Sequence, residues 1–286
     1  MAHEGGSDGS VDVALVDGPP RVFGQSAGRP VSLLVPKAYD PAQPIPLVLV
    51  LHGYGANGWL QATLLGYTEQ LEKGPFLLAY PNGTTDPGGK LFWNATDACC
   101  DYYGAGIDDS AYLLGLIQEI EAAYNVDLKR VYLIGHSNGG FMAYRMACDH
   151  ADRIAAIISL AGATYFDTTA CKPAAPVSVV QIHGDQDTSI LYGGGTTKNG
   201  AYPGAVASTG VWALYNGCGS TRDEVPPTLD LDSLVSGPET VVERYAGCPS
   251  GVDVELWTIK GGGHLPVPTS TFAQKTWEFF QKHPAP

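Results

Sequence analysis

The sequence predicts a mixed α/β fold built on one large, mostly parallel β-sheet. Seven runs of strand-forming residues recur along the chain, at residues 31–36, 46–52, 75–80, 130–134, 154–160, 176–182 and 252–259. Several of them are continuously apolar, which is typical of strands buried on both faces of a parallel sheet with helical connections. The 286 residues and 44% hydrophobic content suffice for one large core, so we expect a single domain.

Helices are expected between these runs, where they flank the sheet. Asp108 or Asp109 is a candidate N-cap, because the apolar residues that follow recur at helical spacing. A second helix is expected to follow Ser137. The apolar patterns at about 205–215 and 271–282 predict two more.

The chain divides into a flexible N-terminal segment, residues 1–20, and a single domain, residues 21–286. The stretch 188–251 is rich in Gly, Pro, Asp and Thr, and we expect an insertion there that one helix and the run 240–245 interrupt. Only a short connection separates the strand-like run ending at residue 160 from the next one. It leaves no room for a long helical excursion, so we expect no lid domain and an open cleft.

The charge of the chain limits its partners. The formal net charge is −13, which disfavours binding to nucleic acid or to anionic lipid because both repel an acidic surface. No run approaches the roughly 20 apolar residues that span a bilayer. We therefore expect the protein neither to bind nucleic acid nor to insert into a membrane. We also expect a monomer.

Six cysteines indicate the compartment in which the protein works. An even set in a chain with few lysines favours disulfides and an oxidising environment, hence a secreted or periplasmic protein, although six buried thiols in a cytosolic protein are the alternative. The first ten residues have no apolar signal region, so we expect that any export signal has been removed or never existed. The order of the cysteines suggests the pairs Cys148 with Cys171 and Cys218 with Cys248, and leaves the adjacent Cys99 and Cys100 unassigned.

A strand followed by a sharp turn with serine at its tip is the most informative motif. The run 130–134 leads into Gly135-His136-Ser137-Asn138-Gly139, and helix-forming residues follow. This context is typical of a nucleophile elbow, in which the flanking glycines let strand and helix approach closely and the serine adopts strained backbone geometry. A second match to the same letters, Gly24 to Gly28, runs into Arg29-Pro30, so we interpret its Ser26 as a turn residue.

A serine nucleophile needs a base to take its proton and an acid to orient the base. His264 is the candidate base, because it lies in a glycine-rich loop directly after the strand-like run 252–259. His150 and His283 are interpreted as solvated. Asp187 is the preferred acid, in the turn after the run 176–182.

Asp185 in the same turn is the competing acid. It is the less favoured of the two, because acidic residues in such turns often bond only their own backbone. His183, at the start of the turn, is expected to shape it.

The oxyanion that forms during attack on a carbonyl requires backbone N–H donors. We expect one from Asn138 at the start of the helix and one from Tyr54, in the loop after the run 46–52. Tyr54, Trp93 and His136 are expected to contact substrate, with core packing as the alternative for the aromatic residues. Gly-rich phosphate loops, zinc spacings and haem motifs are absent from the sequence, so we expect neither metal nor cofactor.

The chain resembles the secreted α/β-hydrolases of the polyhydroxybutyrate depolymerase and feruloyl esterase group. The matching pieces are Leu51-His52-Gly53, the stretch from Trp93 to Cys100, residues 135–140, residues 183–187 and Gly262-Gly263-His264. The resemblance implies an α/β-hydrolase fold and hydrolysis of carboxylic esters without a cofactor. It implies Ser137 as nucleophile, Asp187 as acid and His264 as base, and paired cysteines that brace the active-site loops.

These observations together predict a serine esterase that works through an acyl-enzyme. The expected substrates are polyesters or their oligomers, of the polyhydroxybutyrate, polylactide or polyethylene terephthalate type, and small esters. A feruloyl or acetylxylan esterase of plant cell-wall polysaccharide is the alternative. An alternative of another class is a non-catalytic binding protein on a hydrolase scaffold.

Overall fold

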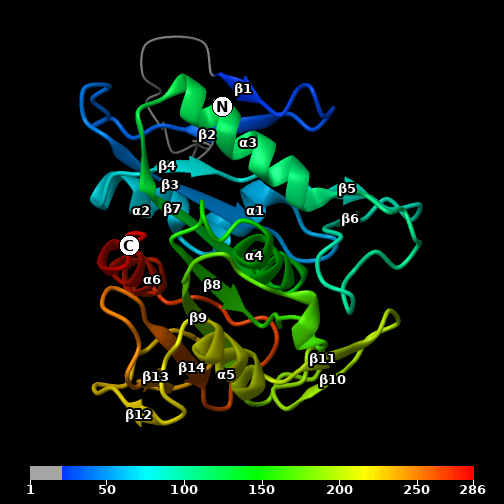
Figure 1. Cartoon of the computed structure of the whole chain (residues 1–286), viewed down its shortest axis with the longest axis vertical. Helices are drawn as coiled ribbons and strands as arrows, with labels where there is room; N and C mark the ends of the chain where they lie inside the picture. The colour runs from blue at the N-terminus through cyan, green and yellow to red at the C-terminus, as the bar shows by residue number, and fades with distance from the viewer. Residues whose placement is uncertain (1–20) are drawn as a thin grey trace, which may run out of the picture.

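The computed structural model describes residues 21–286, and the predicted flexible segment 1–20 lies outside the described residues. Ten strands form one central sheet (Figure 1). In spatial order they are β1 (Val22–Phe23), β2 (Val31–Leu34), β4 (Leu77–Ala79), β3 (Ile45–Leu51), β7 (Val126–His136), β8 (Ala156–Leu160), β9 (Ser178–Gly184), β14 (Val254–Ile259), β13 (Thr240–Tyr245) and β12 (Arg222–Glu224).

The six central strands, from β4 to β14, are parallel, and two antiparallel strands extend the sheet at each edge. Every residue of β3, β8, β9 and β14 is buried, because helices cover both faces of the sheet. The predicted α/β fold with a mostly parallel sheet is confirmed, and each of the seven predicted runs overlaps a strand.

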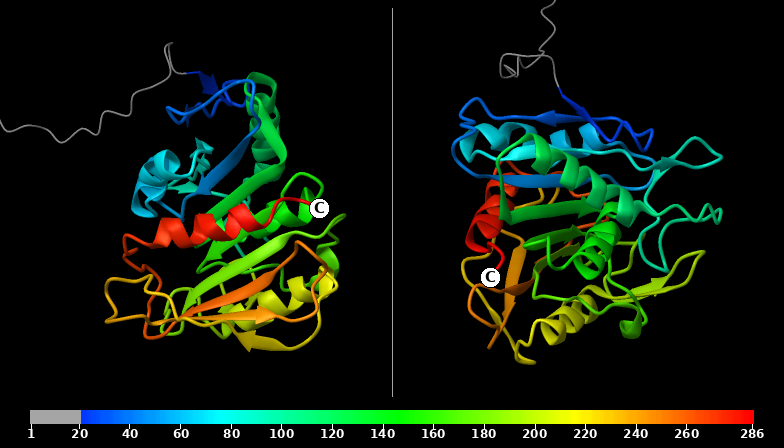
Figure 2. Two further views of the ribbon diagram at one scale, coloured as in Figure 1. Left: turned by 90° about the vertical axis from the view of Figure 1, so that its left-hand side faces the viewer. Right: turned by 45° about the horizontal axis from the view of Figure 1, so that its top comes forward.

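Six helices occur in the described part of the chain: α1 (Gly58–Leu64), α2 (Tyr67–Lys73), α3 (Asp109–Ala123), α4 (Asn138–Asp149), α5 (Ala205–Tyr215) and α6 (Phe272–Lys282). Helices α3, α4 and α5 cover the face toward the viewer in Figure 1, and α1, α2 and α6 cover the opposite face (Figure 2). Alternate residues of β3 point to opposite faces of the sheet. Leu47 and Leu49 pack under α3 and α4, whereas Val48 and Val50 pack under α1, α2 and α6.

The four predicted helices begin and end close to their expected bounds. Asp108 is the N-cap of α3, where its carboxylate accepts the N–H of Ala111. Helices α1 and α2 were not individually predicted, because each has only seven residues and so shows little periodicity.

Two small hairpins also went unpredicted. They are β5 (Thr84–Thr85) with β6 (Leu91–Phe92), and β10 (Gly194–Thr196) with β11 (Ala201–Pro203). Both lie on the right in Figure 1.

The stretch 188–251, predicted as an insertion, contributes to the main architecture. Strand β13 pairs with β14 and so extends the central sheet, and α5 packs against β9 and β14. Only the β10–β11 hairpin and the loops stand apart from the sheet. The connection from β8 to β9 contains a single 3-10 turn, Thr168–Ala170, in agreement with the expected lack of a lid domain.

All six cysteines are paired. Cys148–Cys171 ties the end of α4 to the connection between β8 and β9, and Cys218–Cys248 joins the segments after α5 and β13. These pairings were predicted. Cys99 and Cys100, which the sequence left open, are bonded to each other. Within residues 21–286, no helix combines the length and apolar character that crossing a bilayer requires.

Candidate active site

Ser137 occupies a strained turn between β7 and α4. Its φ of 54° and ψ of −118° lie in a region that residues with a side chain rarely adopt. A Cβ atom on Gly135 would lie 2.1 Å from the carbonyl oxygen of Gly139, and one on Gly139 would lie 2.2 Å from that of Leu51. The predicted elbow and the need for its glycines are thus confirmed. Ser26, the serine of the other matching motif, lies in a turn closed by the N–H of Gly28, as expected.

A continuous chain of hydrogen bonds joins the three predicted triad residues. The Oγ of Ser137 lies 2.9 Å from Nε2 of His264, and Nδ1 of His264 lies 2.7 Å from Oδ2 of Asp187. Asp187 lies in the turn after β9 and His264 in the loop after β14. Both loops follow the carboxyl ends of parallel strands, which meet at one edge of the sheet.

The environment of Asp187 keeps its carboxylate charged. Burial opposes ionisation, but hydrogen bonds from His183, His264 and the backbone N–H of Ile190 outweigh it and hold the pKa of Asp187 well below its ordinary value. A charged carboxylate at this position orients the imidazole of His264 and stabilises its protonated form.

His183 contacts the same carboxylate oxygen as His264. Its Nε2 lies 2.8 Å from the carbonyl oxygen of Ile190 and 3.2 Å from Oδ2 of Asp187. Its Nδ1 faces the amide Nε2 of Gln181 at 3.0 Å, so the imidazole proton belongs on Nε2. His183 therefore braces the turn, as the sequence predicted.

Asp185, the competing acid, makes different contacts. Its Oδ1 accepts the backbone N–H of Gly261 at 2.7 Å, and Lys260 lies nearby with 3.7 Å between Nζ and Oδ2. It thus supports the loop before His264 without bonding the imidazole. His283, interpreted as solvated, is buried at 4% exposure and bonded to Asp253, so that interpretation was wrong. Half-buried His150 contacts Ser110 away from this site.

His136 lies behind the site. Its Nε2 is 2.8 Å from the backbone carbonyl oxygen of His264, to which it donates. Burial and, to a smaller extent, the nearby His264 lower the pKa of His136 to about 4, so the ring is neutral near pH 7. With only 6% of its surface exposed, His136 supports the loop of the proposed base and offers little surface to a substrate.

The two predicted oxyanion donors flank the serine. The N–H of Asn138 belongs to the first turn of α4, where backbone N–H groups lack helical partners. The loop carrying Tyr54 also lies close, since a Cβ atom on Gly53 would be 3.5 Å from Cβ of Ser137. Across residues 21–286, no protein group accepts a hydrogen bond from the N–H of Tyr54 or of Asn138.

The predicted substrate contacts differ in exposure. Tyr54 is half-buried and its hydroxyl donates to Asp86, which fixes the ring at the rim. Trp93 is fully buried, and its indole N–H donates to the carbonyl of His52. The alternative of core packing therefore holds for the side chain of Trp93. Its contact with Asn138, like that of His136 with His264, joins residues far apart in the chain and leaves no local pattern in the sequence.

Comparison with known proteins places the chain among esterases. Residues 35–203, more than half of the chain, match the model of the Phospholipase/Carboxylesterase family. The chain belongs to that family. It is 33% identical over 196 residues to "Feruloyl esterase B" of Piromyces equi, covering 66% of this chain and 33% of that protein. It is 29% identical over 231 residues to "Putative esterase NocK" of Nocardia uniformis subsp. tsuyamanensis, covering 77% of this chain and 64% of that protein.

Solved structures of other esterases share the fold of this chain. The acetyl xylan esterase from Aspergillus awamori superposes with a TM-score of 0.65 at 16% identity, covering 93% of this chain and all of that chain. The Bacillus cereus carboxylesterase gives a TM-score of 0.54 at 16% identity, with 90% and 96% covered. The predicted resemblance to α/β-hydrolase esterases is confirmed. The chain spans about a third of the length of the Piromyces relative.

Proposed function

We propose that this protein is a serine carboxylic ester hydrolase that works through an acyl-enzyme. The observation that carries the proposal is the hydrogen-bonded chain from Oγ of Ser137 through His264 to Asp187. A serine, an imidazole and a buried carboxylate in this arrangement generate a nucleophile that attacks acyl carbon.

In the proposed reaction, Oγ of Ser137 attacks the ester carbonyl carbon while Nε2 of His264 takes the hydroxyl proton. The charged carboxylate of Asp187 stabilises the imidazolium that results. Backbone N–H groups of Asn138 and Tyr54 donate to the oxyanion of the tetrahedral intermediate, and losing one such donor costs about 3 kcal/mol. Collapse expels the alcohol, which takes its proton from His264, and water then hydrolyses the acyl-enzyme by the same steps.

The proposed substrates are esters that an open, lidless site admits. Polyesters, their oligomers and small soluble esters form the first class, since only a short connection follows β8. Esters of hydroxycinnamic or acetyl groups on plant polysaccharides form the second class. The names of relatives, feruloyl esterase and bifunctional acetylxylan esterase/xylanase, favour this second class.

We further propose that residues 21–286 act as a single, monomeric catalytic domain. The three disulfides favour an oxidising compartment, hence secretion or the periplasm. Mass determination in solution and non-reducing electrophoresis of protein recovered from the natural source test these two points.

The test of the activity compares two serines that share the same letter pattern. Ser137→Ala is expected to lower kcat on p-nitrophenyl acetate at least about a thousandfold. Ser26→Ala removes the serine of the other motif, which bonds Glu119, and is expected to leave kcat unchanged. Full activity in Ser137→Ala would overturn the proposal. The wild type is then assayed on methyl ferulate, acetylated xylan and films of polylactide, polyhydroxybutyrate and polyethylene terephthalate, and the ratio of kcat/KM values ranks the soluble substrates.

A further inference from the structure

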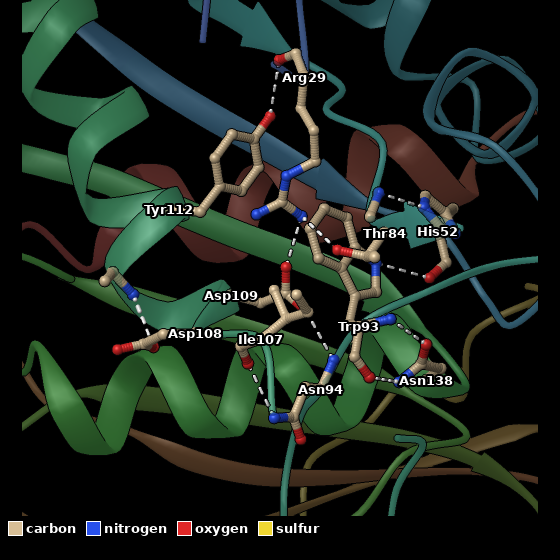
Figure 3. A network of polar contacts seen from close by, with 12 residues as sticks. Arg29, His52, Thr84, Trp93, Asn94, Ile107, Asp108, Asp109, Tyr112 and Asn138 are labelled. Carbon is tan, nitrogen blue, oxygen red and sulfur yellow. Dashed lines mark hydrogen bonds and ion pairs between the residues drawn. The ribbon is translucent and has the colours of Figure 1, made fainter. Parts of the chain in front are cut away.

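The fully buried Trp93 is hydrogen-bonded to Asn138 on one side and to His52 on the other (Figure 3). On one side, the backbone of Trp93 is bonded to the side chain of Asn138. The backbone N–H of Trp93 donates to Oδ1 of Asn138 at 2.7 Å, and Nδ2 of Asn138 donates to the carbonyl oxygen of Trp93 at 2.9 Å. The amide of Asn138 thus pairs with both backbone groups of one residue, and this pair fixes the first residue of α4.

The other side of Trp93 contacts the loop of the second donor. Its indole Nε1–H donates to the carbonyl oxygen of His52 at 3.1 Å, and the two rings pack with 5.0 Å between centroids. His52 is itself fully buried, and burial lowers its pKa to about 4, so its ring is neutral.

The hydrogen bonds of His52 also settle its tautomer. The N–H of Gly83 donates to Nε2 of His52 at 3.0 Å, which leaves the ring proton on Nδ1. That Nδ1 lies 2.8 Å from the carbonyl oxygen of Gly53. This carbonyl belongs to the peptide group whose N–H is that of Tyr54. The ring of His52 therefore holds the orientation of the peptide that carries the second proposed donor.

The segment that carries Trp93 is anchored on its outer side as well. Asp109, which is fully buried and paired with Arg29, accepts the backbone N–H of Asn94 at 2.7 Å. The side-chain amide of Asn94 donates to the carbonyl of Ile107, and the guanidinium of Arg145 donates to the carbonyl of Asn94. Figure 3 shows the contacts of Asn94 with Asp109 and Ile107, and that of Asp109 with Arg29. A segment tied at both sides resists displacement, and buried polar networks of this kind rigidify the groups they join.

From this arrangement we infer that Trp93 is a positioning residue for the oxyanion site. Its indole N–H bonds the Tyr54 side of the site, and its backbone bonds the Asn138 side, so that one residue sets the separation of the two donors. The inference rests on the proposed function. Because the oxyanion exists only after attack, misplaced donors weaken binding of the transition state and leave binding of the ester largely unchanged.

The decisive variant is Trp93→Phe, which keeps an aromatic ring in the core but removes the indole N–H that bonds His52, together with part of the ring volume. We expect kcat on p-nitrophenyl acetate to fall about ten- to a hundredfold, with KM within about twofold of wild type. Inhibition by phenylboronic acid, whose tetrahedral serine adduct places an oxygen toward the donors, is expected to weaken by a similar factor.

Trp212→Phe is the matched control. Trp212 is also fully buried, and its Nε1–H donates to Oγ1 of Thr164 at 3.0 Å, away from the elbow. We expect it to lower the melting temperature about as much as Trp93→Phe while kcat and boronate inhibition stay at wild-type values. Equal kcat in the two variants, or a change in KM alone for Trp93→Phe, would overturn the inference.

A second variant decides the question if Trp93→Phe does not fold. Asn138→Ala keeps the backbone N–H donor and removes the side-chain pair with Trp93. A loss confined to kcat supports the inference, and an unchanged kcat overturns it. The proposed function fails separately, through full activity of Ser137→Ala, whereas an inactive Ser137→Ala with normal Trp93→Phe defeats only the positioning role.

Discussion

The imidazole of His136 donates a hydrogen bond to the backbone carbonyl of His264, with 2.8 Å between Nε2 and oxygen. This bond joins the residue before the proposed nucleophile to the residue proposed as its base, although 128 positions separate them in the chain. The elbow and the loop after β14 are thus linked directly, as well as through the contact between Ser137 and His264. Any loosening of this bond is expected to widen the range of positions that the imidazole of His264 samples.

The first prediction concerns this bond. His136→Ala removes the donor and is expected to lower kcat about tenfold or more, because a displacement of even 1 Å in a reacting group costs up to about a hundredfold. His136→Gln, whose amide can donate to the same carbonyl, is expected to recover part of the loss. Steady-state kinetics on p-nitrophenyl acetate measure both variants. Wild-type kcat in His136→Ala would contradict the supporting role.

The second prediction concerns stability in acid. His52 and His136 have pKa values near 4 in the folded protein, below the value of about 6.5 for an unfolded histidine. The unfolded chain therefore binds more protons than the folded one below pH 6.5. Stability that is fully present above this pH is lost as the pH falls toward 4, by about 2–3 kcal/mol for each ring at pH 4.5.

Urea unfolding at pH 7.5, 5.5 and 4.5 measures this dependence. His136→Gln has no titrating ring at this position, so its free energy of unfolding is expected to fall less steeply with acid than that of the wild type. Parallel curves for the two proteins would exclude the proposed proton linkage. Asp187, whose pKa is also lowered on folding, is present in both proteins, so its own contribution cancels in the comparison.

The sequence was most informative where local pattern and tertiary environment agree. Strand β3 is apolar along its whole length, and β8 and β9 are buried along theirs, because helices cover both faces of the sheet, and this made the fold predictable. Ser137 was predictable because strand, glycines and helix lie within a few residues of it. Asp187 and His264 follow their strands directly, so the topology of the sheet brought them to the correct edge.

Contacts between segments far apart in the chain were harder to predict from the sequence. Burial of Trp93 and His283 depends on which segments cover them, and composition does not specify that. The bond between Cys99 and Cys100 lay outside the pairs that chain order suggested, because adjacent cysteines close no loop. The arrangement of the proposed triad and the role of His183 in the turn were therefore predictable from the sequence, whereas the supporting contacts of Trp93 and His136 required coordinates.

The third prediction separates the two acidic residues of the turn after β9. Asp187→Asn keeps the size of the side chain but removes the charge that orients and stabilises His264, so kcat is expected to fall by about 10⁴, as in other triads. Asp185→Asn is the control, since Asp185 bonds the backbone of Gly261 and not the imidazole. We expect its kcat to stay within about threefold of wild type. The reverse order of activities would identify Asp185 as the acid.

The fourth prediction concerns the close approach of α4 and β3. An added Cβ atom in Gly139→Ala would lie 2.2 Å from the carbonyl oxygen of Leu51, in a fully buried strand that cannot move away. We expect the free energy of unfolding to fall by about 3 kcal/mol, or the protein not to fold.

Gly115→Ala is the matched substitution. Gly115 lies inside α3 with no atom within 4 Å of an added Cβ, so alanine is expected to raise the free energy of unfolding by about 0.5–1 kcal/mol through its higher helix propensity. Urea unfolding followed by circular dichroism compares both variants with the wild type. If Gly139→Ala is as stable as Gly115→Ala, the elbow tolerates a wider separation of helix and strand than the observed contacts allow, and the steric account of its glycines is wrong.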